Sequence, residues 1–223
     1  YNGVMIEKQM PYKYKVYEII KKGIIDGTYQ AGVELNERTL SETLGVSRTP
    51  IREAIQMLER DGWVVLETYK GAVIRSFDHK YLSDLMKVRT ALEVSAVEDA
   101  AKHITEEYLK EIRRLFEVQR QAVEETNVPV YQFIQMDREF HLAIYKLSEN
   151  KTLISLLDNL NDMICVAGMR ALTSDVRRQE TLAEHKEVLN ALEEGDPQKA
   201  IQAMRYHMEK TTENIQQHAD ISQ

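Results

Sequence analysis

The chain has little cysteine, little proline and no long apolar run. Its single cysteine, Cys165, excludes a disulfide framework within the 223 residues and is typical of a reducing compartment. No apolar stretch approaches the ~18 residues that a membrane-spanning helix needs, and no signal-peptide pattern opens the chain. We therefore expect a cytoplasmic protein of one or two domains with no membrane partner.

The charge is unevenly distributed along the chain. The net charge is −7, yet residues 1–75 hold 11 Lys/Arg against 10 Asp/Glu. The acidic balance therefore belongs to the rest of the chain. Any affinity of the first part for nucleic acid must come from locally placed cations, and it should depend steeply on salt.

Residues 36–62, NERTLSETLGVSRTPIREAIQMLERDG, carry the most informative pattern. They predict a short amphipathic helix, a tight turn at Gly45, and a second helix with Ser47 as its N-cap and Pro50 in its first turn. This is a helix-turn-helix, which places its second helix in the major groove of DNA. Three polar or cationic residues in the leading turn would meet bases and phosphates: Arg48, Thr49 and Arg52.

The flanking residues predict a supporting helix and a wing. Residues 14–26 carry apolar side chains at helical spacing before the motif. After it, residues 63–66 and 71–74 predict two short strands. The turn between them would bring Lys70 and Gly71 to the sugar-phosphate backbone, where glycine permits close approach.

Roughly residues 12–76 resemble the DNA-binding domain of the GntR family of bacterial transcription regulators. The matching strings are AGVEL at 31–35, LGVSRTPIREA at 44–54, and the spaced Leu58-x-x-Asp61-Gly62. The resemblance implies a double-stranded DNA operator as partner and a bacterial source. It also implies that three arginines contact DNA, with Thr49 and Gly71 assisting: Arg38, Arg48 and Arg52. Isolated surface arginines usually only solvate a helix face, but these three lie together at the leading ends of the two helices.

The second part of the chain, from about Phe77, has almost no strand signal. Its apolar periodicity predicts six helices: about 79–102, 106–126, 130–148, 151–172, 177–194 and 197–217. Gly195, Asp196 and Pro197 mark the clearest boundary, as helix stop, N-cap and first helical residue. The sequence thus predicts a mainly α protein. Residues 1–76 would form a winged helix-turn-helix, and residues 77–223 an antiparallel bundle of about six helices.

Four potential metal ligands lie on apolar stripes of these helices. Asp137 and His141 are four residues apart and face the same way, while His185 and His207 interrupt the stripes of the last two helices. Burying them without partners would cost several kcal/mol. An Asp and three His suit Zn²⁺, Ni²⁺, Mn²⁺ or Fe²⁺. The residues alone leave open whether they bind a metal or are hydrogen-bonded core residues.

Arg89 is a further charged residue on an apolar face, that of the first bundle helix. A buried guanidinium needs an anion. Glu93, one turn further on, is one candidate partner. An effector carboxylate held by both Arg89 nitrogens is the other, and both interpretations hold if Glu93 orients Arg89.

Residues 78–216 resemble the FCD ligand-binding domain of the FadR-like branch of this family. The matching positions are Arg89-x-x-x-Glu93, Asp137-x-x-Phe140-His141, Glu184-His185, Gly195-Asp196-x-x-x-Ala200 and His207. The resemblance implies a bound divalent metal, with Zn or Ni favoured, at Asp137, His141, His185 and His207. It further implies that open coordination positions accept a small organic acid, with Arg89 and Glu93 binding the effector.

Together these patterns predict a homodimeric transcription regulator that binds an inverted repeat and responds to an effector. A metalloregulator, for which the metal itself is the signal, would use the same residues. A metal-dependent hydrolase is a weaker alternative, because neither an HExxH helix nor a nucleophile elbow is present. We therefore expect no enzyme activity.

Overall fold

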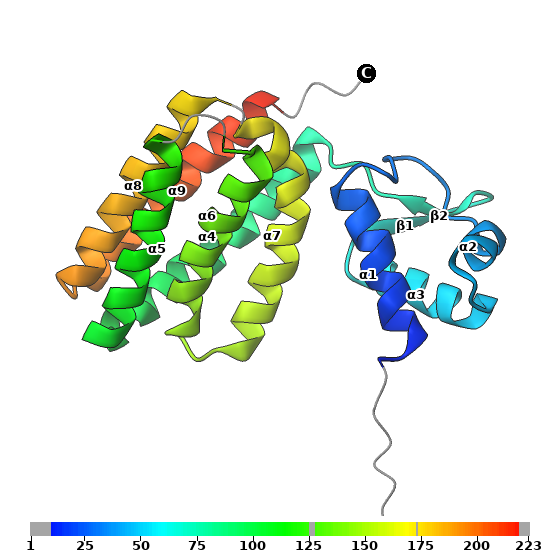
Figure 1. Ribbon diagram of the computed structural model, residues 1–223, viewed down its shortest axis with the longest axis horizontal. Helices are drawn as coiled ribbons and strands as arrows, with labels where there is room; N and C mark the ends of the chain where they lie inside the picture. Colours follow the sequence, from blue (N-terminus) through cyan, green and yellow to red (C-terminus); the bar gives the residue numbers. More distant parts are fainter. Residues whose placement is uncertain (1–9, 125–127, 173, 219–223) are drawn as a thin grey trace, which may run out of the picture. The chain divides into compact units, whose positions relative to one another are not determined.

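The computed structural model describes residues 10–124, 128–172 and 174–218, and the chain divides after Ser76 into two compact units. The described ranges contain nine helices and one two-stranded sheet (Figure 1). This architecture confirms the predicted fold class, a winged helix-turn-helix followed by a helical bundle. Within the described ranges, no helix is both long and apolar enough to span a membrane.

The first unit is built on three helices, α1 (Tyr12–Ile25), α2 (Glu37–Leu44) and α3 (Arg48–Arg60). The Asn36 side chain caps α2 by accepting hydrogen bonds from the backbone N–H groups of Arg38 and Thr39. Gly45 then turns the chain in the left-handed conformation, with φ 65° and ψ 30°. α1 packs against α3 over a core that includes Ile20, Ile51 and Leu58.

The wing consists of β1 (Val64–Glu67) and β2 (Gly71–Ile74), paired antiparallel with Val64 opposite Ile74. The first strand begins one residue later than predicted, because Trp63 is buried in the core rather than paired in the sheet. Residues 32–35 follow the other edge of β2, where the Leu35 N–H donates to the Ala72 carbonyl. This second row of hydrogen bonds holds the wing beside the helix-turn-helix.

The second unit is a bundle of six helices. Their bounds lie within two residues of the predicted ones, although residues 125–126 of the predicted second helix lie outside the described ranges: α4 (His79–His103), α5 (Glu106–Glu124), α6 (Val130–Lys146), α7 (Lys151–Ala171), α8 (Asp175–Glu193) and α9 (Pro197–His218). As predicted, α9 starts at Pro197, and the Asp196 carboxylate accepts from the N–H groups of Gln198 and Lys199.

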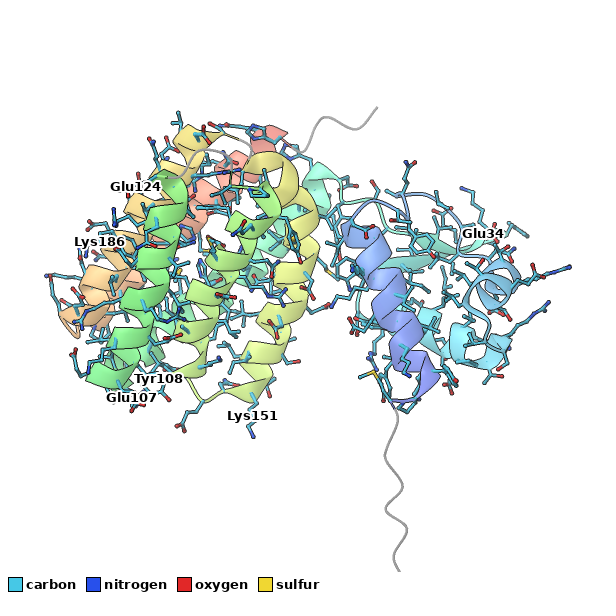
Figure 2. The ribbon with its side chains drawn as sticks, in the orientation of Figure 1. Glu34, Glu107, Tyr108, Glu124, Lys151 and Lys186 are labelled. Carbon is cyan, nitrogen blue, oxygen red and sulfur yellow. The ribbon has the colours of Figure 1, made fainter. Side chains whose placement is uncertain are left out.

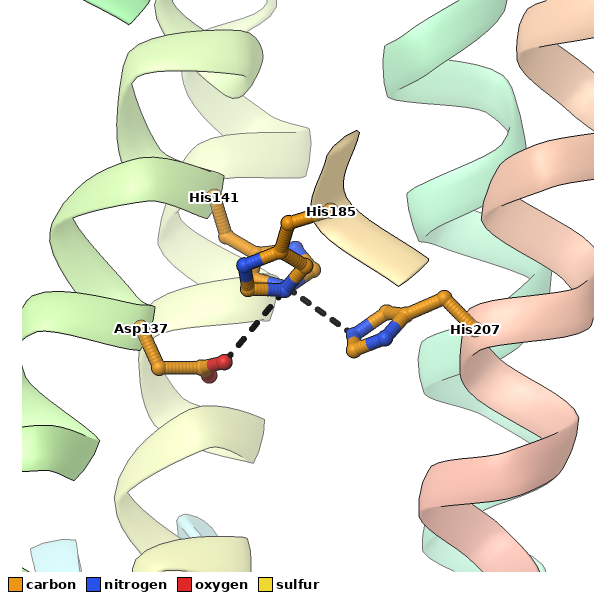
Figure 3. A group of neighbouring side chains, drawn as sticks. All are labelled: Asp137, His141, His185 and His207. Carbon is orange, nitrogen blue, oxygen red and sulfur yellow. Dashed lines mark hydrogen bonds and ion pairs between the residues drawn. The ribbon is translucent and has the colours of Figure 1, made fainter. Parts of the chain in front are cut away.

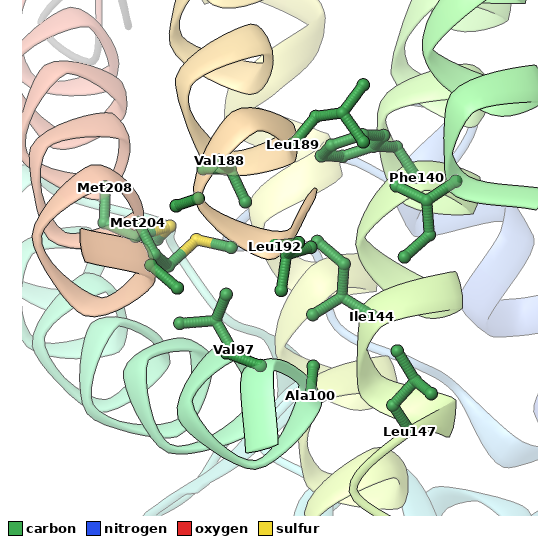
Figure 4. Packing of buried hydrophobic residues seen from close by; sticks show 14 of the residues in the cluster. Val97, Ala100, Phe140, Ile144, Leu147, Val188, Leu189, Leu192, Met204 and Met208 are labelled. Atoms are coloured by element: carbon green, nitrogen blue, oxygen red, sulfur yellow. The ribbon is translucent and has the colours of Figure 1, made fainter. Parts of the chain in front are cut away.

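The bundle core forms where α4, α6, α8 and α9 meet, and Figure 4 shows its packing. These helices contribute the following buried side chains: Val97, Ala100, Phe140, Ile144, Val188, Leu192, Met204 and Met208. Charged side chains such as Glu107, Glu124 and Lys186 point outward instead (Figure 2). The packed core fixes four helices whose facing sides also carry the ionisable residues described next.

Candidate functional site

Three helices bring the predicted ligand residues to one point inside the bundle. Asp137 and His141 come from α6, His185 from α8 and His207 from α9, and their ligand atoms lie within 4.8 Å of one another (Figure 3). His141 Nε2 is 3.2 Å from His207 Nε2, and His185 Nε2 is 3.4 Å from Asp137 Oδ1. The three histidines are almost completely buried, whereas Asp137 retains some exposure.

The outer nitrogen of each histidine has its own hydrogen-bond acceptor. Nδ1 lies 3.1 Å from Glu93 in His141, 2.8 Å from Gln119 Oε1 in His185 and 2.8 Å from Glu184 in His207, as the three contacts of the cluster show. Because Nδ1 then carries the proton, each Nε2 presents a lone pair to the common centre.

These facing lone pairs repel one another unless a cation lies between them. His185 Nε2 is also a buried polar atom without a hydrogen-bond partner. Ligands about 2.1 Å from a metal lie roughly 3–4 Å apart, as the Nε2 atoms of His141 and His207 do. The residues therefore fit a divalent transition metal, and the cluster could hold one.

Burial favours the neutral, metal-binding form of the imidazoles. Burial, followed by the charges of His207 and His141, holds the pKa of His185 well below its usual value. Burial likewise lowers the pKa of His207, against the opposing hydrogen bond to Glu184. Uncharged His185 and His207 are the forms that ligate a cation.

Two buried arginines hold the carboxylates behind the histidines. Arg89 Nε donates to Glu93 at 3.1 Å, and Arg177 donates to both oxygens of Glu184 at 2.5 and 3.0 Å. Burial opposes ionisation of Glu93, but His141 and Arg89 outweigh it and lower the pKa of Glu93 to about 2. Both carboxylates are thus held as anions that orient the imidazoles.

A cavity opens beside the histidine cluster, with about 690 Å³ of empty space including solvent at its mouth. Arg89, Asp137 and His207 line it, and so does Arg177, which the sequence analysis missed. A helical signal existed, because Arg177 precedes Glu184 by seven residues and lies on the same face of α8. Glu93, predicted to bind an effector, does not line the cavity and instead lies fully buried behind Arg89.

The sequence analysis also missed two residues around the cluster, Gln119 and Tyr145. Gln119 accepts from His185, and the Tyr145 hydroxyl donates to Glu93. Gln119 reaches the cluster from α5, a helix that carries none of the four ligands. No spacing within one helix signals such a contact.

The predicted DNA-contacting residues lie on the first unit. Arg38, Arg48, Arg52 and Gly71 line one concave surface between the helix-turn-helix and the wing. Arg52 pairs with both oxygens of Glu37, at 3.0 and 2.8 Å, and so is held in place. Arg48 is exposed at the start of α3.

The remaining predicted DNA contacts are also at the surface. Ser47 occupies the N-cap position of α3 but makes no capping hydrogen bond through its side chain, contrary to expectation. Its hydroxyl and that of Thr49 are in exposed residues. Lys70 is exposed on the turn of the wing and pairs with Glu67 at 2.9 Å.

Comparison with known proteins identifies both units. The family model of bacterial regulatory proteins, gntR family, matches residues 13–74, and that of the FCD domain matches residues 84–210. The chain belongs to the GntR family. This GntR-family protein is 30% identical to the uncharacterized HTH-type transcriptional regulator YdhC of Bacillus subtilis, over 94% of this chain and 93% of that relative.

Two solved structures share its fold. E. coli McbR/YncC matches with a TM-score of 0.75 and 23% identity over 94% of this chain and 99% of that one. The metal-free FCD domain of TM0439, described as a putative transcriptional regulator, matches with a TM-score of 0.51 and 24% identity, over 64% and 96%. At these identities the likeness concerns the fold alone.

Proposed function

We propose that this GntR-family protein is a DNA-binding transcription regulator whose operator affinity is controlled by a small carboxylate bound at a metal site in its FCD domain. The observation that carries the proposal is the convergence of three Nε2 atoms and the Asp137 carboxylate beside a cavity lined by Arg89. The helix-turn-helix with its exposed arginines supports the DNA-binding half.

The metal would be held by Asp137, His141, His185 and His207, with Zn or Ni favoured over Mn or Fe. A metal bound there would offer open coordination positions to a carboxylate oxygen. Arg89 uses Nε toward Glu93, which leaves its two Nη groups for the same carboxylate. The adjoining cavity favours an organic effector over a metalloregulator, because sensing a metal alone requires no cavity.

The DNA partner would be an inverted-repeat operator bound by a homodimer in the bacterial cytoplasm. One recognition helix contacts too few base pairs for useful specificity, so two must act together. Arg38, Arg48 and Arg52 would contact the operator, with Ser47, Thr49, Lys70 and Gly71 assisting. Effector binding would change the spacing of the two recognition helices. The available energy is the difference in effector affinity between the two states.

Elemental analysis of the purified protein tests the metal site. We expect about one transition metal per chain in the wild type and none in a His141→Ala/His185→Ala variant. A His103→Ala/His218→Ala variant is the matched control, because those rings contact only backbone carbonyls of their own helices. Wild-type protein that holds no metal even after addition of Zn²⁺, Ni²⁺ or Mn²⁺ would refute the proposal.

A further inference from the structure

Part of the cavity is formed by polar groups that have no partner in the protein. Asn161 of α7 is 9% exposed, and neither its Nδ2 nor its Oδ1 makes a hydrogen bond. Asn214 of α9 contributes a third such atom, its Oδ1. Both side chains line the cavity beside Arg89. In the described part of the chain, three of the five unpartnered buried side-chain atoms therefore belong to this one cavity.

Buried polar atoms without partners are unfavourable, so these three atoms indicate an occupant that bonds to them. Their immediate surroundings do not provide it, because the neighbouring cavity walls are apolar: Ile134, Ile164, Cys165 and Ile215. The occupant must accept one hydrogen bond and donate two. The first conclusion holds for either orientation of the Asn161 amide, since both of its atoms lack partners.

The required pattern discriminates between ligand classes. A carboxylate oxygen only accepts, so a second carboxylate would face the Oδ1 atoms of Asn161 and Asn214 without a proton between them. A methylene chain neither donates nor accepts. A hydroxyl group does both, and neighbouring hydroxyls on one chain satisfy several such atoms together.

We infer that the effector is a hydroxylated monocarboxylate, with its carboxylate toward Arg89 and the histidine cluster and its hydroxyls on Asn161 and Asn214. The carboxylate end of this inference rests on the proposed function, and the hydroxylated end is new. It assigns Asn161 and Asn214 as specificity-determining residues that distinguish hydroxy acids from fatty acids and dicarboxylic acids.

Calorimetric titration of the full chain, supplied with Zn²⁺, tests this. The probes are two sets of equal chain length: threonate, butyrate and succinate, and gluconate, hexanoate and adipate. In at least one set we expect the hydroxy acid to bind about tenfold more tightly than the other two acids. Asn161→Leu, similar in size but without hydrogen bonds, should weaken the hydroxy acid about tenfold and leave the fatty acid unchanged or tighter.

Asn190→Leu is the control, because Asn190 lies on α8 outside the cavity lining, and it should keep the wild-type preference. If Asn161→Leu does not fold, Asn214→Leu on α9 provides the same comparison. Equal binding of fatty and hydroxy acids, or tighter binding of the dicarboxylates, would overturn this inference and leave the proposed carboxylate site intact. Binding of none of the six acids would overturn both.

Discussion

The hydrogen bond between His185 and Gln119 sets the orientation of one ligand of the cluster. His185 Nδ1 donates to Gln119 Oε1 at 2.8 Å, and this leaves Nε2 directed at the other ligands. Gln119→Leu removes the acceptor while keeping the volume. We predict that the substitution lowers metal affinity about 10- to 100-fold, because the ring loses its fixed orientation and tautomer. Competition with a chromophoric chelator measures the affinity.

Gln121→Leu provides the control for this prediction. Gln121 lies on the same helix but is exposed, so its replacement should leave metal affinity unchanged. Equal metal affinity in Gln119→Leu and wild type would mean that the Gln119 contact does not orient the ligand. Circular dichroism of both variants checks that the helices remain folded.

Arg48 and Arg60 lie at opposite ends of the recognition helix and so separate DNA contact from general charge. Arg48→Ala should weaken operator binding by about 1–3 kcal/mol, because Arg48 projects from the leading turn. Arg60→Ala removes the same charge near the far end, where Arg60 pairs with Asp61, and should have a much smaller effect. Fluorescence anisotropy with an operator fragment measures both. Equal losses would favour a non-specific charge effect.

At the scale of an element, the turn of the helix-turn-helix depends on Gly45. Its φ of 65° lies in the left-handed region, and no atom lies within 4 Å of an added Cβ, so the strain of a substitution is purely conformational. Gly45→Ala should lower the free energy of unfolding of the first unit by about 1 kcal/mol. Gly45→Asn should lower it less, because asparagine tolerates this conformation.

The only tryptophan of the chain, Trp63, makes this prediction measurable. Trp63 is completely buried in the first unit, so urea unfolding followed by its fluorescence reports on that unit. Equal stability of Gly45→Ala and Gly45→Asn would contradict the conformational argument. Wild-type stability in both variants would show that the turn tolerates side chains without strain.

The helices differ in how far their sequences could predict them. In α9 the boundary was predictable because Asp196 and Pro197 are specific start signals. In α8 the predicted inward stripe placed Leu182 inside, whereas Thr181 is buried and Leu182 is only partly so. Arg177 and Glu184 are buried on a second side of α8, so no single apolar stripe marks it.

The same distinction applies to the site. The four candidate ligands were predictable because each interrupts an apolar stripe, which is a feature of one helix at a time. Gln119 and Asn161 were not, because their roles depend on which helix lies opposite them. Such contacts between helices arise from three-dimensional packing, which periodicity does not encode.

At the scale of the whole molecule, the two units can be followed by separate signals, because Trp63 lies in the first and the proposed metal ligands lie in the second. A metal that binds only the folded bundle stabilises it by about 4 kcal/mol when its free concentration is 1,000 times its dissociation constant. For a unit of this size that corresponds to roughly 10 °C in Tm. Chelation should therefore lower the melting temperature of the bundle by about that amount.

The Trp63 transition should stay where it is, since no candidate ligand lies in the first unit. Melting followed by circular dichroism at 222 nm reports mainly on the six bundle helices, and tryptophan fluorescence in the same scan reports on the first unit. The His141→Ala/His185→Ala variant is the control, because chelator should not change its melting. An equal shift of both signals would mean that the two units unfold together. A chelator effect that persists in the variant would place the stabilising metal outside the histidine cluster.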